Sequence, residues 1–168
     1  YAVEVLDVGK NQVLLDLAAG TGDISSLIGQ RLPRSSMLIA CDANFRMLSV
    51  GRDKMTDLGL VEGINHVRSR AESLPFDDST VDRAIIGFGL RNFSDQIKAL
   101  KEMYRVLKVG ARIVILEFSE VRNPQLSKLY DFYSFKVLPM LGKAIVKDSE
   151  SYVYLAESIR KHPNQESL

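Results

Sequence analysis

The chain has 168 residues, a length typical of one domain with a single hydrophobic core. Its 22 basic and 21 acidic residues leave a net charge of +1, so the composition shows no electrostatic footprint for nucleic acid or for an anionic membrane. A single cysteine, Cys41, excludes an internal disulfide framework and a cysteine zinc cluster. Neither a signal peptide nor a run of about 20 apolar residues occurs. We expect a cytoplasmic protein, with at most peripheral membrane contact, in which residues 1–168 form one domain.

Strand-like and helix-like patterns alternate between residues 12 and 118 without a long linker or a repeat. The expected strands cover residues 13–15, 37–41, 66–69, 81–86 and 112–118, and the expected helices cover 24–28, 44–58 and 95–109. The buried face of the last helix is predicted to carry Ile97, Leu100, Met103, Tyr104 and Leu107. Regular alternation predicts an α/β fold with an open, mostly parallel sheet and helices on both faces.

A glycine turn follows the first strand, in the sequence Asp-Leu-Ala-Ala-Gly-Thr-Gly-Asp from Asp16 to Asp23. Gly20 and Gly22 permit a positive φ and a close approach of the backbone to a ligand. A dinucleotide fingerprint needs glycine or alanine where Ser25 stands, and a Walker A loop needs a lysine that the turn lacks. The two carboxylates suit a cation, and S-adenosylmethionine carries two cationic groups and no phosphate. A glycine turn of this kind also occurs for structural reasons alone.

Other polar residues follow the ends of the later strands, where open parallel sheets bind their ligands. Asp42 ends the second strand, and an acid there can accept hydrogen bonds from both hydroxyls of a ribose, although Asp-Ala-Asn is also good turn chemistry. Residues 70–76 offer a polar edge and an apolar wall for an adenine. Residues 87–89, Gly-Phe-Gly, offer bare backbone for the methyl-bearing end of a cofactor.

Several segments together resemble the ubiquinone/menaquinone biosynthesis C-methyltransferases, a class I S-adenosylmethionine-dependent family. They are residues 16–23, 72–76, 88–92, 104–108 and 116–118, and the similarity continues to 154–163. Phe-Gly-Leu-Arg-Asn at 88–92 and Tyr-Leu-Ala-Glu-Ser-Ile-Arg at 154–160 are the most specific of them. The resemblance implies a Rossmann-like fold and transfer of a methyl group to a ring carbon of a demethylated polyprenyl quinol in menaquinone or ubiquinone biosynthesis.

The resemblance also implies which residues contact S-adenosylmethionine. Together with the acid and the glycines of the turn, the candidate set is Asp16, Gly20, Thr21, Gly22, Asp42, Arg70, Ala71 and Gly87. Arg70 stands where the family usually has Asn or Asp, so this cation must swing outward or stack on the adenine. Family members also have an N-terminal helical region and a final antiparallel strand pair, so the resemblance implies a domain truncated at both ends.

Methylation of a quinol carbon requires a base or a group that stabilises the phenolate. The candidates are Arg91, Asn92 and His162, with a salt bridge as the alternative role of Arg91 and a helix cap as that of His162. Apolar residues within 126–141 are candidates either for a lid over the quinone or for packing against the sheet. The stretch 138–141 is a candidate for transient membrane contact. No metal site is expected, because the two histidines lie far apart in the sequence without paired ligands.

Other functions remain open from the sequence. The glycine turn and Asp42 would serve a methyltransferase of another small molecule equally well. A non-catalytic scaffold within a quinone-synthesis complex is a further alternative, although such a subunit has no physical need for both glycines and the acid. The expected partners are the polyprenyl quinol and, for assembly, a second copy of the chain or a quinone-synthesis complex. A nicotinamide dehydrogenase is disfavoured by Ser25.

Overall fold

The computed structural model describes residues 1–118, 154 and 157–159. The chain divides into two compact units, Tyr1–Glu117 and Phe118–Leu168, and all of the strands described lie in the first. His162 and the apolar stretch 126–141 fall outside the described residues. The interpretation of the whole chain as one domain therefore stays a prediction.

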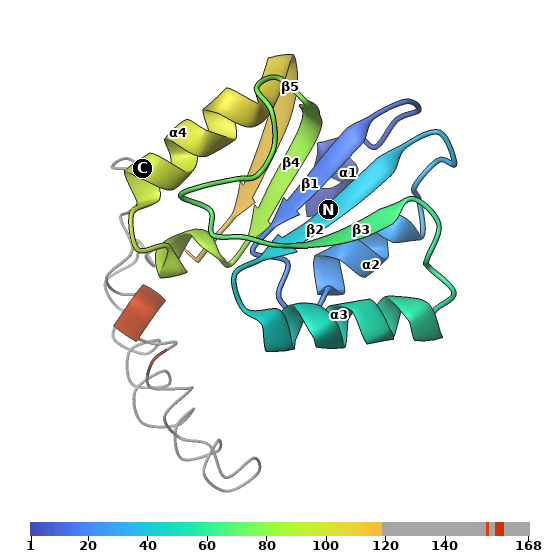
Figure 1. Cartoon of the computed structure of the whole chain (residues 1–168), viewed down its shortest axis with the longest axis horizontal. Helices are drawn as coiled ribbons and strands as arrows, with labels where there is room; N and C mark the ends of the chain where they lie inside the picture. Colours follow the sequence, from blue (N-terminus) through green and yellow to red (C-terminus); the bar gives the residue numbers. More distant parts are fainter. Residues whose placement is uncertain (119–153, 155–156, 160–168) are drawn as a thin grey trace, which may run out of the picture. The chain divides into compact units, whose positions relative to one another are not determined.

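The first unit is a five-stranded sheet in the order β3-β2-β1-β4-β5, with every neighbouring pair parallel (Figure 1). Its elements are α1 (Ala2–Leu6), β1 (Val13–Leu17), α2 (Asp23–Gly29), β2 (Met37–Asp42), α3 (Phe45–Asp57), β3 (Ile64–Arg68), β4 (Val81–Gly87), the short 3₁₀ helix η1 (Leu90–Asn92), α4 (Gln96–Val106) and β5 (Leu107–Leu116). From β1 the chain continues outward to β2 and β3, and it then returns to place β4 on the other side of β1. The topological switch point therefore lies between β1 and β4. The predicted parallel α/β sheet is confirmed.

Alternate residues of the central strands face opposite sides of the sheet, and both sides are covered. Leu14, Leu38 and Ile85 pack with α1 and α2 on one side. Leu15, Ile39 and other residues of the same strands pack with α4 on the opposite side. Figure 1 shows α2 and α3 below the sheet and α4 above it. This burial on both faces explains the runs of consecutive apolar residues in the central strands, residues 13–15 of β1, 37–41 of β2 and 84–86 of β4, and it confirms the prediction of helices on both faces.

The connection between β3 and β4, residues 69–80, contains no helix. Crossovers between parallel strands usually run through a helix, which satisfies its own backbone groups. Here an irregular segment covers part of the sheet instead, and its Ala71 and Leu74 are buried in the core shared with α4. The backbone of this segment therefore needs hydrogen-bond partners from elsewhere in the fold.

The boundary between the last helix and the last strand differs from the prediction. The sequence predicted a helix that Gly110 ends, whereas α4 ends at Val106 and β5 starts at Leu107. Leu107 has extended backbone angles and pairs with Val81, and the Lys108 ammonium donates to Asp82 at 2.8 and 2.9 Å, which supports the extended course.

The predicted buried face of α4 was also partly wrong. Ile97 and Tyr104 are 68% and 86% exposed, while Ala99, Met103 and Val106 form the buried stripe. Side chains cap two of the helices: the Asn44 side chain accepts from two backbone amides of α3, and the Asp95 side chain accepts from the Lys98 amide. The helix α2 instead starts from Gly22 without a side-chain cap hydrogen bond. In the part of the chain that the structure describes, no helix combines the length and apolar character needed to cross a bilayer.

Candidate functional site

A cleft of about 690 Å³ lies at the carboxyl ends of the strands, beside the switch point. The loops after β1, β2, β3 and β4 all contribute to it. Nine of the predicted site residues line the cleft: Asp16, Gly20, Thr21, Asp42, Arg70, Ala71, Gly87, Arg91 and Asn92. The topology thus gathers at one place residues that are spread over most of the first unit.

The glycine turn has a tightly wound backbone. Ala18, Gly20 and Gly22 all have a positive φ, of 61°, 55° and 75°. Gly22 is not among the residues that line the cleft, because it faces α3: a Cβ on Gly22 would lie 3.2 Å from the Cα of Gly51. A Cβ on Gly51, in turn, would lie 3.2 Å from backbone atoms of Thr21 and Gly22, which is closer than an ordinary van der Waals contact. A pair of glycines therefore lets α3 approach the turn closely.

Asp16 lies at the base of the turn and is buried, with 1% of its surface exposed. Its Oδ2 accepts a hydrogen bond of 2.5 Å from the Ser25 hydroxyl, while its Oδ1 is buried without a partner among the described residues. Burial raises the pKa of Asp16 from 3.8 to about 7, and the charge of Asp42 adds to the increase, although the Ser25 hydrogen bonds oppose it. A buried carboxylate with an unsatisfied oxygen at the edge of a cleft is suited to a cationic ligand.

Asp42 connects the turn after β1 to the start of α3. Its Oδ2 accepts from the Gly20 amide at 2.8 Å and its Oδ1 accepts from the Asn44 amide at 2.7 Å. The turn role and the predicted ligand role are compatible, because each carboxylate oxygen can accept more than one hydrogen bond. Asp42 therefore fixes the loop and also presents acceptors to the cleft.

The wall after β3 consists of Ser69, Arg70, Ala71 and Glu72. The Arg70 guanidinium turns toward Glu72, with Nε 3.4 Å from Oε2, and it donates to the Ser94 hydroxyl at 3.1 Å. Arg70 was expected either to swing outward or to stack on the adenine. In the structure its guanidinium instead pairs with these two neighbouring polar groups. Glu72 is buried, and although burial opposes ionisation, backbone amides and the Arg70 charge hold its pKa below the ordinary value.

The turn after β4 closes the cleft from the other side. Phe88 has a φ of 56°, a left-handed conformation that is uncommon outside glycine. A Cβ on Gly89 would lie 2.5 Å from the Cβ of Ala18, so the turns after β1 and β4 are in direct contact. A Cβ on Gly87 would lie 2.0 Å from Cδ1 of Ile24, so this side chain occupies the space beside Gly87.

Arg91 forms a buried ion pair with Glu117. Its Nη1 lies 2.8 Å from Oε2, its backbone amide donates to Oε1 at 3.2 Å, and the side chains are 9% and 6% exposed. The salt bridge that was the alternative role of Arg91 is therefore present, and it joins η1 to the residue that follows β5. Arg91 and its neighbour Asn92 also line the cleft, so the structure leaves both as candidates for a role in catalysis.

Sequence reasoning missed several features of this site. Glu117 was quoted only within a motif, and the positive φ of Ala18 and Phe88 had no signal in the sequence. Gly51 did carry a signal, because a glycine inside a helix is unfavourable and often marks a close contact. Among the described residues, no group of three His, Cys, Asp or Glu side chains could hold a metal ion.

Solved structures show the same architecture. A SAM-dependent methyltransferase from Aquifex aeolicus is similar with a TM-score of 0.66 and 22% identity, over 73% of this chain and 64% of that chain. The YcgJ protein from Bacillus subtilis is similar with a TM-score of 0.67 and 18% identity, over 98% and 83% of the two chains. The fold is the Rossmann-like fold of class I methyltransferases.

Comparison of sequences identifies the family within this fold. The model of the ubiE/COQ5 methyltransferase family matches residues 2–168. Proteins named ubiquinone/menaquinone biosynthesis C-methyltransferase UbiE are 52% identical in Xanthomonas oryzae pv. oryzae, 50% in Haemophilus ducreyi and 51% in Psychromonas ingrahamii, each over the whole of this chain. The chain spans 66%, 65% and 67% of the length of these relatives. The chain belongs to the ubiE/COQ5 methyltransferase family, as its motifs predicted.

Proposed function

We propose that this chain belongs to an S-adenosylmethionine-dependent C-methyltransferase that methylates a ring carbon of a demethylated polyprenyl quinol in menaquinone or ubiquinone biosynthesis. The observation that carries the proposal is the cleft at the switch point, in which the buried Asp16 has an oxygen without a partner in the described part of the chain, beside the glycine turn. The names of the relatives from Xanthomonas, Haemophilus and Psychromonas support the choice of acceptor.

The chemistry of the cleft fits this methyl donor, whose sulfonium supplies the methyl group when it is bound. Asp16 provides a negative charge for a cationic group, and Asp42 provides acceptors for ribose hydroxyls. Arg70 and Ala71 form the wall where an adenine would rest. Gly87 lines the cleft at the end of β4, where its missing Cβ makes room for the Ile24 side chain, so this end of the cleft combines backbone with an apolar side chain beside the reactive end of the ligand.

The remaining task of the site is to make the acceptor carbon nucleophilic. The ring carbon of a hydroquinone attacks most readily when a neighbouring hydroxyl is ionised. Arg91 can favour the phenolate through its positive charge, while as a cation it is a poor proton acceptor. Asn92 can donate a hydrogen bond to the same oxygen, and His162 remains a proposed base. Correct placement of the acceptor accounts for much of the expected rate enhancement.

The partner and location also belong to this proposal. The substrate is a polyprenyl quinol with a long apolar tail, so we propose a cytoplasmic enzyme that contacts the membrane peripherally, with residues 138–141 as the candidate contact. Association in a homo-oligomer or in a quinone-synthesis complex is a further part of the proposal. Liposome flotation with quinone present would place the protein with the vesicles, and a protein that stayed in the soluble fraction would contradict the membrane contact.

The dehydrogenase alternative is disfavoured by what Ser25 does in the fold. Its hydroxyl is buried and donates to Asp16, so position 25 serves this carboxylate rather than the close helix packing that a third glycine would allow. The same arrangement weakens the scaffold alternative, because a buried acid with an oxygen that no described residue satisfies is costly in a protein without a ligand for it.

Calorimetry with S-adenosylhomocysteine tests the proposal. We expect wild-type protein to bind this product, to ignore NAD, and to gain about 2.7 kcal/mol in free energy of unfolding at a hundredfold excess over Kd. Asp42→Ala should abolish binding, whereas Asp57→Ala, an exposed acid of α3 outside the cleft, should leave it intact. If folded wild-type protein does not bind, the proposed enzymatic function is wrong. If the wild-type protein does bind, methyl transfer from S-adenosylmethionine is next assayed with demethylated benzoquinols and naphthoquinols as acceptors.

A further inference from the structure

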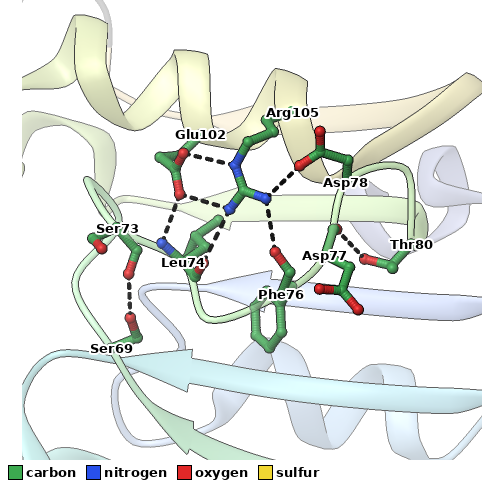
Figure 2. Close-up of polar contacts among 9 residues, drawn as sticks. All are labelled: Ser69, Ser73, Leu74, Phe76, Asp77, Asp78, Thr80, Glu102 and Arg105. Atoms are coloured by element: carbon green, nitrogen blue, oxygen red, sulfur yellow. Dashed lines mark hydrogen bonds and ion pairs between the residues drawn. The ribbon is translucent and has the colours of Figure 1, made fainter.

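The cleft wall after β3 depends on contacts with α4. The irregular connection 69–80 passes between β3 and β4, and its first residues line the cleft while Leu74 is buried against the core. Figure 2 shows Glu102 and Arg105 extending from α4 toward the backbone of this connection. The motifs at residues 72–76 and 104–108 lie far apart in the sequence, and hydrogen bonds from Arg105 to Leu74 and Phe76 join them here.

Arg105 uses all five of its N–H donors on this connection and on its own helix (Figure 2). Nη1 donates to the Phe76 carbonyl and to Asp78, both at 2.8 Å. Nη2 donates to the Leu74 carbonyl at 3.0 Å and to Oε2 of Glu102 at 2.8 Å, and Nε donates to Oε1 of Glu102 at 2.8 Å. A planar guanidinium can make this set of contacts, whereas a lysine ammonium, with three donors at one point, cannot.

Glu102 completes the set from the acceptor side. Its Oε2 also accepts from the Leu74 amide at 2.8 Å, so both backbone polar groups of Leu74 are held by side chains of α4. The Arg105 hydrogen bonds and the Leu74 amide hold the pKa of Glu102 at about 2, so the carboxylate stays charged throughout the physiological range. The Arg105–Glu102 clamp, as we name these two residues, therefore pairs opposite charges at neutral pH.

A second attachment lies just before the clamp. Glu72 accepts from the Ser94 and Asp95 amides at 2.9 and 3.3 Å, at the start of α4. The cleft wall is thus attached to one end of α4 through Glu72 and to the other end through the clamp at Leu74. Because Glu72 itself lines the cleft, displacement of Leu74 would move the residues that form the cleft wall.

We propose that Arg105 and Glu102 are positioning residues that set the place of Arg70, Ala71 and Glu72 in the cleft, and that their function is to determine affinity for the adenosyl ligand. The inference rests on the proposed function, because it concerns the ligand of the same cleft. Neither clamp residue lines the cleft, so any effect on binding must act through the wall.

The test replaces Arg105 by lysine, which keeps the charge and removes the planar fork. We expect Arg105→Lys to raise the Kd for S-adenosylhomocysteine and the KM for S-adenosylmethionine about tenfold, while kcat at saturating donor changes by less than about twofold. Glu102→Gln should raise the same constants. The double variant should raise Kd and KM by less than the product of the two single increases, because both substitutions disrupt the same clamp.

Arg112→Lys is the matched control. Arg112 lies on β5 and donates to the Val5 carbonyl at 2.7 Å, away from the cleft, so its replacement also removes a side-chain-to-backbone contact. We expect it to change thermal stability without changing Kd or KM. All binding measurements are made at a temperature at which circular dichroism shows each variant to be fully folded.

The outcomes separate the two hypotheses. If wild-type protein does not bind S-adenosylhomocysteine, the proposed function fails and this inference fails with it. If wild-type protein binds and Arg105→Lys binds equally well, the clamp is a stability element only and the inference alone is overturned. A fall in kcat with an unchanged KM would also overturn it, because a displaced wall acts on donor binding.

Discussion

Replacement of Asp16 by asparagine should stabilise the fold at neutral and alkaline pH and weaken ligand binding. The pKa of Asp16 is about 7 in the folded protein against an ordinary value of 3.8. Between these two values the unfolded chain has lost the proton while the folded chain still holds it, so the free energy of unfolding falls as the pH rises. With about 1.4 kcal/mol for each pH unit, the total loss between pH 4 and pH 7 is about 4 kcal/mol.

Asparagine has nearly the same shape as aspartate and can still accept the Ser25 hydroxyl, but it carries no charge. The difference in unfolding free energy between Asp16→Asn and wild type should therefore increase by about 4 kcal/mol from about pH 4 to about pH 8. Taking the difference cancels the carboxyl groups that both proteins share, such as Glu102, whose lowered pKa stabilises the fold above about pH 2.

Urea unfolding followed by circular dichroism measures this difference, since the chain has no tryptophan for fluorescence. Calorimetry on the same samples should show weaker binding of S-adenosylhomocysteine to Asp16→Asn than to wild type. If Asp16→Asn is more stable than wild type and binds the ligand less well, the buried acid lowers the stability of the fold and contributes to ligand binding. Parallel stability curves for the two proteins would refute the reasoning, because Asp16 would then titrate at its ordinary pKa.

Three further substitutions probe the packing around the cleft. Glu117→Ala removes the carboxylate that faces the buried Arg91 and should lower the free energy of unfolding by about 3 kcal/mol in urea titrations; a loss below about 1 kcal/mol would contradict a buried pair. Gly89→Ala should cost about 1–3 kcal/mol, since its Cβ meets that of Ala18, and Ala18→Gly should rescue it in a double-mutant cycle. Gly51→Ala should weaken S-adenosylhomocysteine binding with little change in Tm, because the gain in helix propensity offsets the contact with the glycine turn; unchanged binding would show that the turn tolerates the methyl group.

The sheet could be predicted from the sequence because its central strands are buried on both faces. Burial of both faces requires a continuous apolar run, and β1, β2 and β4 have such runs within their bounds. Alternation with helical segments then predicted that the strands are parallel, while the strand order and the place of the switch point come from the structure. The carboxylates and glycines at the strand ends were predicted together for the same reason, since topology alone gathers those ends.

The end of α4 could not be predicted, because its residues suit either structure. Val106 and Leu107 are both apolar and pack against the same core, so their residue types do not separate the end of a helix from the start of a strand. What decides between the two is pairing with Val81 on β4, a contact between residues distant in the sequence. Tyr104 was placed on the buried face by spacing alone, but the stripe that faces the sheet is narrower and is formed by smaller residues such as Ala99.

Within the site, residue types could be predicted and their partners could not. The sequence identified Arg91 as a candidate and offered a salt bridge as one role, but Glu117 became its partner only through the place of β5 beside β4. The left-handed conformation of Ala18 arises where the turns after β1 and β4 meet, which is again a contact between distant segments. Spacing rules describe one element at a time and carry no information on such contacts.

The connection 69–80 shows how such a contact can be anticipated in other proteins of this fold. A crossover without a helix leaves backbone N–H and C=O groups that must find partners when the segment covers a core. The helix that packs on the same side of the sheet is the nearest source, and an arginine with a glutamate three residues before it on that helix offers both donors and acceptors. Arg105 and Glu102 have this spacing, so the absence of a helical pattern after β3 and the presence of such a pair on α4 are two parts of one structural requirement.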